Sequence, residues 1–208
     1  MNEKEILSTL GGVGALLKDS HIVYTSGKHG ESYVNKDALY PHTELTSKLC
    51  EVIAMHFSAT KIDVIAAPAL GGIILSQWTA HHLSRINKRE VLSIYGEKTS
   101  DDNFVIKRGY DKLLSHRRVL VVEDVLTTGG SVKKMVAIVR QLQGDVVGIG
   151  ALCNRGGLSA QSLGVPDFFP LVSLDLSSWE AASCPLCIKK IPINTQVGKG
   201  REFLEANS

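Results

Sequence analysis

The sequence predicts an α/β protein built on a central parallel sheet with helices on both faces. From residue 44 to residue 174, apolar runs of strand length alternate with segments of helical periodicity, and this alternation is typical of parallel sheets. Residues 119–122 are all Val or Leu, which indicates a strand buried on both of its faces. The 208 residues include 19 Gly, and so many glycines in an aliphatic chain favour loops that approach a ligand closely.

The first forty residues predict a small N-terminal unit, a hood beside the sheet. Residues 2–18 space their Leu and Ile side chains as a helix does, although three glycines weaken the middle of the segment. Residues 22–25 and 32–36 are extended pieces on either side of turn-prone glycines. We expect them to form a hairpin with Lys28 and His29 at a basic tip.

The first part of the sheet follows in βαβ order. Residues 44–57 have helical periodicity, and the short apolar run at residues 63–67 ends at a proline, as a buried strand does. We expect a turn at residues 68–72, a helix at residues 73–84 and the next strand at residues 90–95.

The second part of the sheet surrounds the apolar run described above. Residues 98–103 are polar and charged, and we expect a mobile loop there, followed by a short strand at residues 104–107. Residues 131–142 place their apolar side chains on one helical face. Residues 146–152 and 169–174 read as two further strands, and the tail that follows is polar and irregular.

Composition excludes several classes of protein. Lys and Arg total 23 against 21 Asp and Glu, so the formal net charge of +2 gives no overall basic field for nucleic acid. No apolar segment reaches the roughly 18 residues of a membrane span, and the N-terminus has charges where a signal peptide has an apolar stretch. Four cysteines form no secreted disulfide framework. We therefore expect a cytoplasmic protein with reduced thiols and no nucleic-acid or membrane partner.

The most informative segment is residues 121–131, where the apolar strand ends in two acids and a Thr-Thr-Gly-Gly-Ser loop leads into a helix. Ligands of open parallel sheets bind beyond the carboxyl ends of the strands. Backbone N–H groups, hydroxyls and a helix N-terminus suit a phosphate. Glu123 and Asp124 would repel that phosphate, but a sugar diol can donate to them and Mg²⁺ can neutralise them. The pattern predicts a site for a phosphorylated sugar; the alternative is an ordinary strand–turn–helix with Ser131 as its N-cap.

This segment resembles the phosphoribosyl pyrophosphate (PRPP) motif of the type I phosphoribosyltransferases. Further segments resemble the orotate phosphoribosyltransferases within that family, so that the resemblance runs from about residue 20 to residue 198. They are the hairpin motifs at residues 25–29 and 33–36, the Pro-Ala-Leu-Gly-Gly-Ile run at residues 68–73, Lys-Arg-Gly-Tyr at residues 107–110, Asn-Arg at residues 154–155, and the tail motifs Cys-Pro-Leu-Cys at residues 184–187 and Ile-Pro at residues 191–192.

The resemblance implies a function: transfer of the 5-phosphoribosyl group from PRPP to orotate with Mg²⁺, giving orotidine 5′-monophosphate and pyrophosphate in pyrimidine synthesis. It implies one phosphoribosyltransferase domain, with a hood of about residues 1–40 plus the tail and a core of about residues 41–175. It also implies a homodimer. Mg²⁺ would be bound mainly through PRPP, without a protein metal site.

The resemblance also assigns residues. Lys98 and Asp124 are the expected catalytic residues. Orotate would contact Thr127, Arg155 and Lys28, with the Arg155 fork facing the carboxylate. The residues expected to bind PRPP are Glu123, Asp124, Val125, Leu126, Thr127, Thr128, Gly129, Gly130, Ser131, Ala69, Leu70, Gly71 and Lys98.

Two departures from the family pattern leave alternatives open. The loop after residue 95 carries Lys98 as its single basic residue, where relatives have several, so Lys107 or Arg108 are alternatives for the cation that meets the leaving group. Asn154 stands where Asp is commoner, which bears on how Arg155 is oriented. Action on another base, and a PRPP-sensing regulator of the same fold, are the alternative functions.

Cys184 and Cys187 have the spacing of half a zinc site. A four-ligand site needs two more ligands, and no second close pair of cysteines or histidines accompanies them. A redox disulfide is the other alternative. We expect two thiols and no metal.

Overall fold

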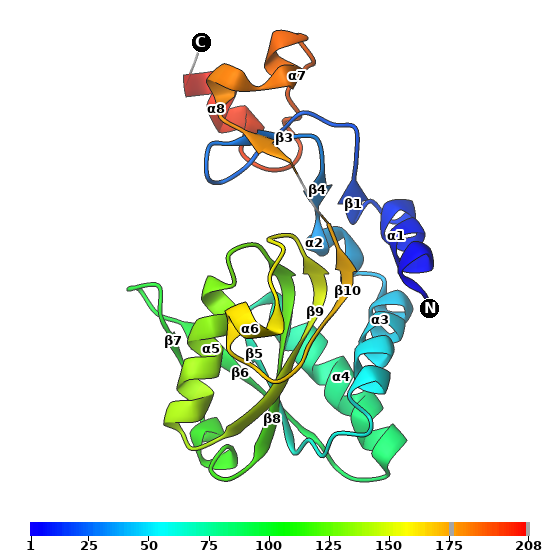
Figure 1. Ribbon diagram of the computed structural model, residues 1–208, viewed down its shortest axis with the longest axis vertical. Helices are drawn as coiled ribbons and strands as arrows, with labels where there is room; N and C mark the ends of the chain where they lie inside the picture. The colour runs from blue at the N-terminus through cyan, green and yellow to red at the C-terminus, as the bar shows by residue number, and fades with distance from the viewer. Residues whose placement is uncertain (175–176, 207–208) are drawn as a thin grey trace. The chain divides into compact units, whose positions relative to one another are not determined.

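A computed structural model describes residues 1–174 and 177–206 of the chain (Figure 1). The chain divides into two compact units. The first contains Met1–Ile6 and Tyr40–Leu174, and the second contains Leu7–Leu39 and Asp175–Ser208. The expected hood and core have boundaries near these, whereas their union in one phosphoribosyltransferase domain stays a prediction.

The first unit is built on a six-stranded sheet in the order β10-β9-β8-β5-β6-β7. The strands from β10 to β6 are parallel to their neighbours, and β7 pairs antiparallel with β6. The strands are β5 (Val64–Pro68), β6 (Leu92–Lys98), β7 (Phe104–Val105), β8 (Arg118–Leu126), β9 (Asp145–Asn154) and β10 (Phe168–Ser173).

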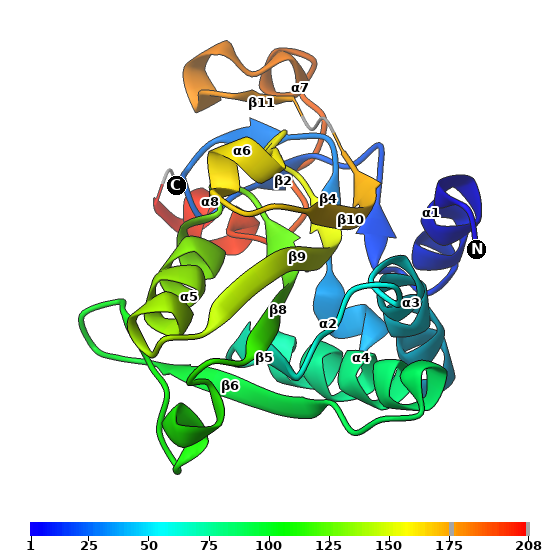
Figure 2. The same ribbon diagram turned by 60° about the horizontal axis from the view of Figure 1, so that its bottom comes forward.

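Helices cover both faces of this sheet (Figures 1 and 2). On one face lie α3 (Thr43–His56) and α4 (Gly71–Asn87), and on the other lies α5 (Gly130–Gln141). Shorter helices at Tyr110–Leu113 (3-10) and Ala160–Leu163 (α6) complete the unit. The predicted parallel α/β sheet is confirmed.

Alternation along the strands explains how one sheet packs against two helical layers. Val64, Ala66, Val119 and Val121 belong to the buried cluster that includes the apolar side chains of α5. Side chains at successive strand positions point to opposite faces, so Ile65 and its counterparts on β8 face the α3–α4 layer. All five residues of β5 are buried, as an uninterrupted apolar strand requires.

The order of the strands fixes where a ligand can bind. From β5 the chain moves to β6 on one side, and later to β8 on the other side of β5. The carboxyl ends of β5 and β8 therefore flank the point where the winding reverses, and open α/β sheets bind ligands there.

The second unit consists of short elements from both ends of the chain. β1 (Leu16–Leu17) pairs with β4 (Tyr33–Val34), and β3 (His29–Gly30) pairs with both β2 (Ile22–Val23) and β11 (Ser178–Trp179), all antiparallel. The helices are α2 (Lys36–Leu39), a 3-10 turn at Ala181–Ser183, α7 (Pro185–Ile188) and α8 (Gly200–Ala206).

Two predictions for the N-terminal segment were wrong in detail. Helix α1 covers Glu3–Gly12 rather than residues 2–18, because Gly14 adopts φ +71°, which ends the helical path before β1. The hairpin closes between β2 and β3, and β4 leaves it to pair with β1. His29 is therefore not at an exposed tip: its side chain lies in β3 and is fully buried.

No helix in the described part of the chain is both long enough and apolar enough to cross a membrane.

Candidate functional site

A cavity of about 190 Å³ opens where β8 ends. It lies beside the reversal point of the sheet and is bounded by one continuous stretch of chain. The lining residues are Glu123, Val125, Leu126, Thr127, Thr128, Gly129, Gly130, Ser131 and Val132.

The loop of this cavity turns through a left-handed glycine. Gly129 adopts φ +74° immediately before α5, a conformation that side chains with a Cβ rarely adopt. A Cβ at Gly129 would also lie 3.0 Å from Leu163 and 3.1 Å from Leu158. The backbone can therefore enter the 12-residue helix α5 with its first N–H groups at the cavity. Such a terminus favours an anion.

Two buried carboxylates lie at the start of the same stretch. Glu123 is 8% exposed and Asp124 is 7% exposed. Glu123 Oε1 accepts from the Asp124 N–H at 3.0 Å, and Asp124 Oδ1 accepts from the Val125 N–H at 2.6 Å. These backbone donors hold the carboxylates at the strand end, because a buried charge is tolerated only when it is hydrogen-bonded.

Tyr40 is a neighbour of this pair that sequence reasoning missed. Its hydroxyl donates to Asp124 Oδ2 at 3.3 Å. Burial raises the pKa of Tyr40 far above its usual range, and the charge of Asp124 raises it further, so the phenol stays protonated as a donor. Tyr40 is 84 residues from Asp124 in sequence, and no local pattern links the two.

Arg155 lies against the start of the loop. Its backbone N–H and that of Gly156 both donate to the carbonyl of Leu126, at 2.8 and 3.2 Å. A Cβ at Gly156 would lie 1.6 Å from the Thr127 carbonyl oxygen, so only glycine permits this approach. The structure thus brings Arg155 beside Thr127, the two residues of this unit expected to contact orotate.

Asn154 braces the segment that follows. Its side-chain nitrogen donates to the Leu158 carbonyl at 2.9 Å, and its oxygen accepts from the Leu158 N–H at 3.1 Å. A carboxylate can accept but cannot donate. The departure from the commoner Asp therefore has a structural reason here: the amide closes the turn that carries Arg155.

The loop after β5, residues Ala69 to Gly71, has no charged side chain and can offer only backbone groups to a ligand. The Ala69 N–H donates to the Gly96 carbonyl at 2.9 Å, the peptide bond between Ala69 and Leu70 is cis, and the Leu70 side chain is 82% exposed. Gly71 begins α4 and is buried. These residues lie at the carboxyl end of β5, the other strand at the reversal point.

Lys98 ends β6 and forms an ion pair with Asp102. Lys134 of α5 meets the same carboxylate at 3.1 Å, and the two lysines hold the pKa of Asp102 below its usual range. Arg108 pairs with Glu97 at 2.7 Å, whereas Lys107 makes no ion pair with any residue that the structure describes. Lys98, Lys107 and Arg108 are therefore the three candidates for the cation that meets the leaving group.

Lys28 belongs to the second unit, where it is exposed and pairs with Glu180 at 3.2 Å. The same unit contains a second group that sequence reasoning missed. His21 and His29 lie together with Cys184 and Cys187, with all four ligating atoms within 4.8 Å of one another. The two ligands that would complete a site with Cys184 and Cys187 are His21 and His29. They are eight residues apart in sequence and are diagonal neighbours in the β2–β3 hairpin.

Comparisons with known proteins agree with this geometry. Residues 35–180 match the family described as Phosphoribosyl transferase domain. The orotate phosphoribosyltransferase of Caldicellulosiruptor bescii is 35% identical over 193 residues, which are 93% of this chain and 96% of that protein.

Solved structures share the fold at lower identity. The orotate phosphoribosyltransferase of Mycobacterium tuberculosis, crystallised with inorganic phosphate, has a TM-score of 0.65 at 19% identity and covers 83% of this chain and 95% of its own. The same enzyme has also been crystallised with PRPP. Adenine phosphoribosyltransferase from Thermoanaerobacter pseudethanolicus has a TM-score of 0.62 at 20% identity, covering 79% of this chain and 99% of its own.

Proposed function

Since the chain belongs to the orotate phosphoribosyltransferase family, we propose that it transfers the 5-phosphoribosyl group from PRPP to orotate in pyrimidine biosynthesis. The observation that carries the proposal is the cavity at the end of β8. Glu123 and the anion-binding loop line this cavity, Asp124 is hydrogen-bonded to Glu123, and the Arg155 backbone is hydrogen-bonded to Leu126.

The loop from Thr127 to Ser131 would bind the 5′-phosphate of PRPP. Its backbone N–H groups and hydroxyls line the cavity, and the first turn of α5 adds a favourable dipole. Val125 and Leu126 connect this loop to the strand. Binding through backbone groups explains how a chain of net charge +2 can hold a multiply charged anion.

Glu123 and Asp124 would accept hydrogen bonds from the ribose hydroxyls. Charge-assisted bonds of this kind are about twice as strong as neutral ones, and they would orient the anomeric carbon. Carboxylate oxygens also suit Mg²⁺, so the donor set fits the ion when PRPP brings it. Mg²⁺ would neutralise charge on the departing pyrophosphate.

Thr127 and Arg155 would contact orotate. The Arg155 guanidinium can bind the carboxylate of the base through two parallel hydrogen bonds. Lys28 of the second unit is the third expected contact. Since a neutral purine has no carboxylate for Arg155, this residue would set the preference for an anionic base.

Ala69, Leu70 and Gly71 would present backbone groups to the pyrophosphate, and Lys98 would add a positive charge. The ion pair with Asp102 has to open for that contact. Bond breaking at the anomeric carbon runs ahead of bond making, so the protein supplies preorganised charge and exclusion of water rather than a strong nucleophile. The orotate nitrogen then bonds to the anomeric carbon as the carbon–oxygen bond to pyrophosphate breaks, and the proton of that nitrogen passes to pyrophosphate or water.

Two further parts of the proposal concern context. A homodimer is proposed because the resembling family shares its loop across subunits, and sedimentation of the purified protein tests it. A cytoplasmic location is proposed because the four cysteines form no secreted disulfide framework.

A panel of bases tests the reaction itself. With PRPP and Mg²⁺, pyrophosphate release should depend on orotate, and the product should be orotidine 5′-monophosphate. The fold similarity to an adenine phosphoribosyltransferase makes a purine base the second candidate. Release with adenine or hypoxanthine, without release on orotate, would establish that candidate instead.

Arg155→Ala tests the base-binding role. We expect the KM for orotate to rise about tenfold or more, because a charge-assisted bidentate contact is lost, while the KM for PRPP changes little. Arg117→Ala is the control, since Arg117 is exposed beyond the amino end of β8. Equal losses for both substrates would mean that Arg155 has only a structural role.

A further inference from the structure

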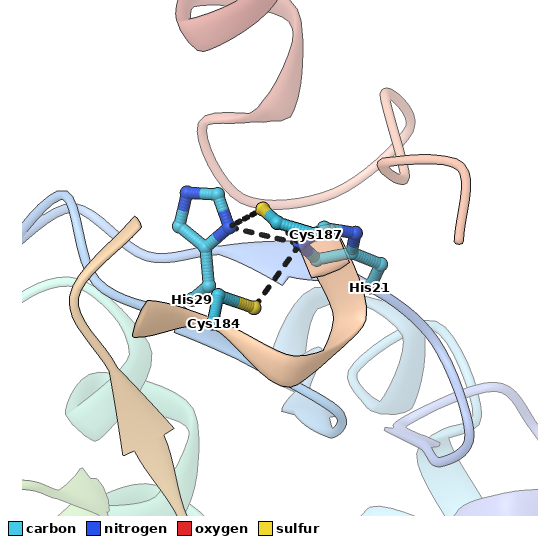
Figure 3. A group of neighbouring side chains, drawn as sticks. All are labelled: His21, His29, Cys184 and Cys187. Atoms are coloured by element: carbon cyan, nitrogen blue, oxygen red, sulfur yellow. Dashed lines mark hydrogen bonds between the residues drawn. The ribbon is translucent and has the colours of Figure 1, made fainter. Parts of the chain in front are cut away.

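Two histidines and two cysteines of the second unit converge on one point (Figure 3). His21 directly precedes β2, His29 lies in β3, Cys184 directly precedes α7, and Cys187 lies within α7. Every pair of their ligating atoms is within 4.8 Å. The cluster therefore joins segments that are more than 150 residues apart in the chain.

Strand register explains why the two histidines meet. Val23 and His29 are directly opposite each other in the β2–β3 pair. His21 is two positions before Val23, so it projects from the same face and is the diagonal neighbour of His29. The fold thus places both imidazoles on one side of the hairpin, although they are eight residues apart in sequence.

Local helix geometry explains the two cysteines. Cys184 is the residue before α7, and Pro185 begins that helix with the fixed φ that suits a first helical position. Cys187 is three residues after Cys184 and so returns to the same side of the turn. Both sulfur atoms thereby reach the hairpin, with Cys187 Sγ at 3.3 Å from His29 Nδ1.

The distances match a tetrahedral zinc shell. With Zn–S near 2.3 Å and Zn–N near 2.05 Å, the tetrahedral S···N edge is about 3.6 Å and the N···N edge about 3.3 Å. The two cysteine sulfurs each lie 3.7 Å from His21 Nε2, and Cys187 Sγ lies 3.3 Å from His29 Nδ1. The fourth S···N pair, Cys184 with His29, is within 4.8 Å. The two imidazole nitrogens are 2.8 Å apart, so the rings need to separate by about half an ångström.

His21 is already oriented as a ligand. Its Nδ1 lies 2.7 Å from the carbonyl oxygen of Ile191, and since that oxygen can only accept, Nδ1 is the donor. In the neutral ring, Nε2 then keeps its lone pair and faces the cluster. Metal-binding histidines usually donate their other N–H to a carbonyl or carboxylate in this way.

Burial makes the cluster costly without a cation. His21 is 2% exposed, and His29 and Cys184 are both 0% exposed. The ring of His29 packs edge-on against Phe203, with 4.8 Å between the centroids. Polar groups gathered in this way, away from water, need a compensating interaction.

We propose that His21, His29, Cys184 and Cys187 bind one Zn²⁺ ion as a closed structural site. Two thiolates and two imidazoles in tetrahedral arrangement are a typical zinc set, and four protein ligands leave no open position for a substrate. The ion would fasten the C-terminal tail to the N-terminal hairpin. Units this small rarely bury enough apolar surface to be stable unaided, and the strands here have only two residues each.

Metal content of the full-length protein tests the site without reference to transferase activity. Protein that is expressed in zinc-containing medium and purified without chelators should contain about one zinc ion per chain, as measured by elemental mass spectrometry. The double variant Cys184→Ser/Cys187→Ser should contain at least tenfold less. Cys50→Ser is the matched control, because Cys50 is a buried thiol in α3, outside the cluster, and should leave the zinc content unchanged.

Cobalt substitution of the unmodified protein keeps the test decisive if the variants do not fold. After metal removal, Co²⁺ should give the ligand-field and thiolate charge-transfer bands of a tetrahedral S₂N₂ site, and added Zn²⁺ should abolish them. The proposal is overturned if unmodified protein holds no zinc and takes up neither Zn²⁺ nor Co²⁺. It is equally overturned if intact mass shows a Cys184–Cys187 disulfide, two hydrogens lighter, in protein that contains no metal.

Discussion

The two units of this chain are built around different kinds of buried side chains. The first has a six-stranded sheet with an extensive aliphatic core, and its candidate cavity is lined by the end of β8 and the loop that follows it. The second has two-residue strands, and its most buried polar side chains form a cluster of His and Cys. In the first unit a large core supports a polar site, whereas in the second a smaller set of buried apolar side chains, among them Ile22, Val23 and Tyr24, accompanies the polar cluster.

Substitutions should have different consequences in the two units. A site carried by a rigid sheet can lose a functional group without losing its shape, because the surrounding packing fixes the backbone. A small unit held by a few ligands loses its shape when one ligand is removed. Activity and stability should therefore be separable in the first unit and inseparable in the second.

The largest effect that we expect separates activity from stability in the first unit. Asp124→Asn should lower kcat about 100-fold or more, because a charge-assisted ribose contact is lost. Asn can still accept from the Val125 N–H, and its amide N–H can donate to the Tyr40 hydroxyl oxygen in place of the bond that Tyr40 donates to Asp124, so the melting temperature should change little. Steady-state kinetics and a thermal melt measure both quantities.

Asp145→Asn provides the control, since Asp145 is an exposed residue at the opposite end of β9. It should leave both kcat and the melting temperature unchanged. If Asp124→Asn retains kcat within twofold of the unmodified protein, Asp124 does not hold the ribose.

Metal removal should separate the two units. If Zn²⁺ fastens the second unit, then chelation should raise hydrogen exchange about tenfold or more in β2, β3 and α7, while β5 and β8 keep their protection. Mass spectrometry of peptides before and after chelation, with zinc added back, measures this. Equal loss of protection in both units would show that the second unit is not an independent region of stability.

A glycine substitution probes how tightly the first unit holds its loop. The Cβ of Gly156→Ala would lie 1.6 Å from the Thr127 carbonyl oxygen, which belongs to backbone and cannot rotate away. We expect a loss of about 1–3 kcal/mol in the free energy of unfolding, as overpacking causes, and about a tenfold higher KM for both substrates.

Gly11→Ala is the matched control. A Cβ at Gly11 in α1 meets nothing within 4 Å, so alanine should stabilise the helix by about 0.5–1 kcal/mol. Chemical denaturation of the two variants should therefore give shifts of opposite sign. A neutral Gly156→Ala would show that the loop is free to move away from Arg155.

The same contrast explains what the sequence predicts and what it does not. The strands from β5 to β10 and the cavity loop follow from apolar runs, helical periodicity and a Gly-Gly turn, all of which act over a few residues. The contact of Tyr40 with Asp124 depends on the tertiary path of the chain. The burial of His29 depends on strand register, which was misjudged because β4 pairs with β1 instead of closing the hairpin.

The smallest effect concerns the ion pair beside the first unit's site. Asp102 pairs with both Lys98 and Lys134; the side chains of Asp102 and Lys98 are more than half exposed, and that of Lys134 is partly exposed. Exposed ion pairs contribute little and are screened by salt. Asp102→Asn should therefore raise kcat by no more than about threefold at low ionic strength, by freeing Lys98 for the pyrophosphate, and the gain should vanish in high salt.

A double variant identifies which lysine is responsible for that gain. If Lys98 meets the leaving group, Lys98→Ala should lower kcat, and adding Asp102→Asn to it should restore nothing, since the freed charge is absent. If the gain from Asp102→Asn persists without Lys98, the lysine that was freed is Lys134. If Lys107→Ala or Arg108→Ala lowers kcat more than Lys98→Ala does, the cation lies in the segment after β7, and the loop that begins at Lys98 only positions it.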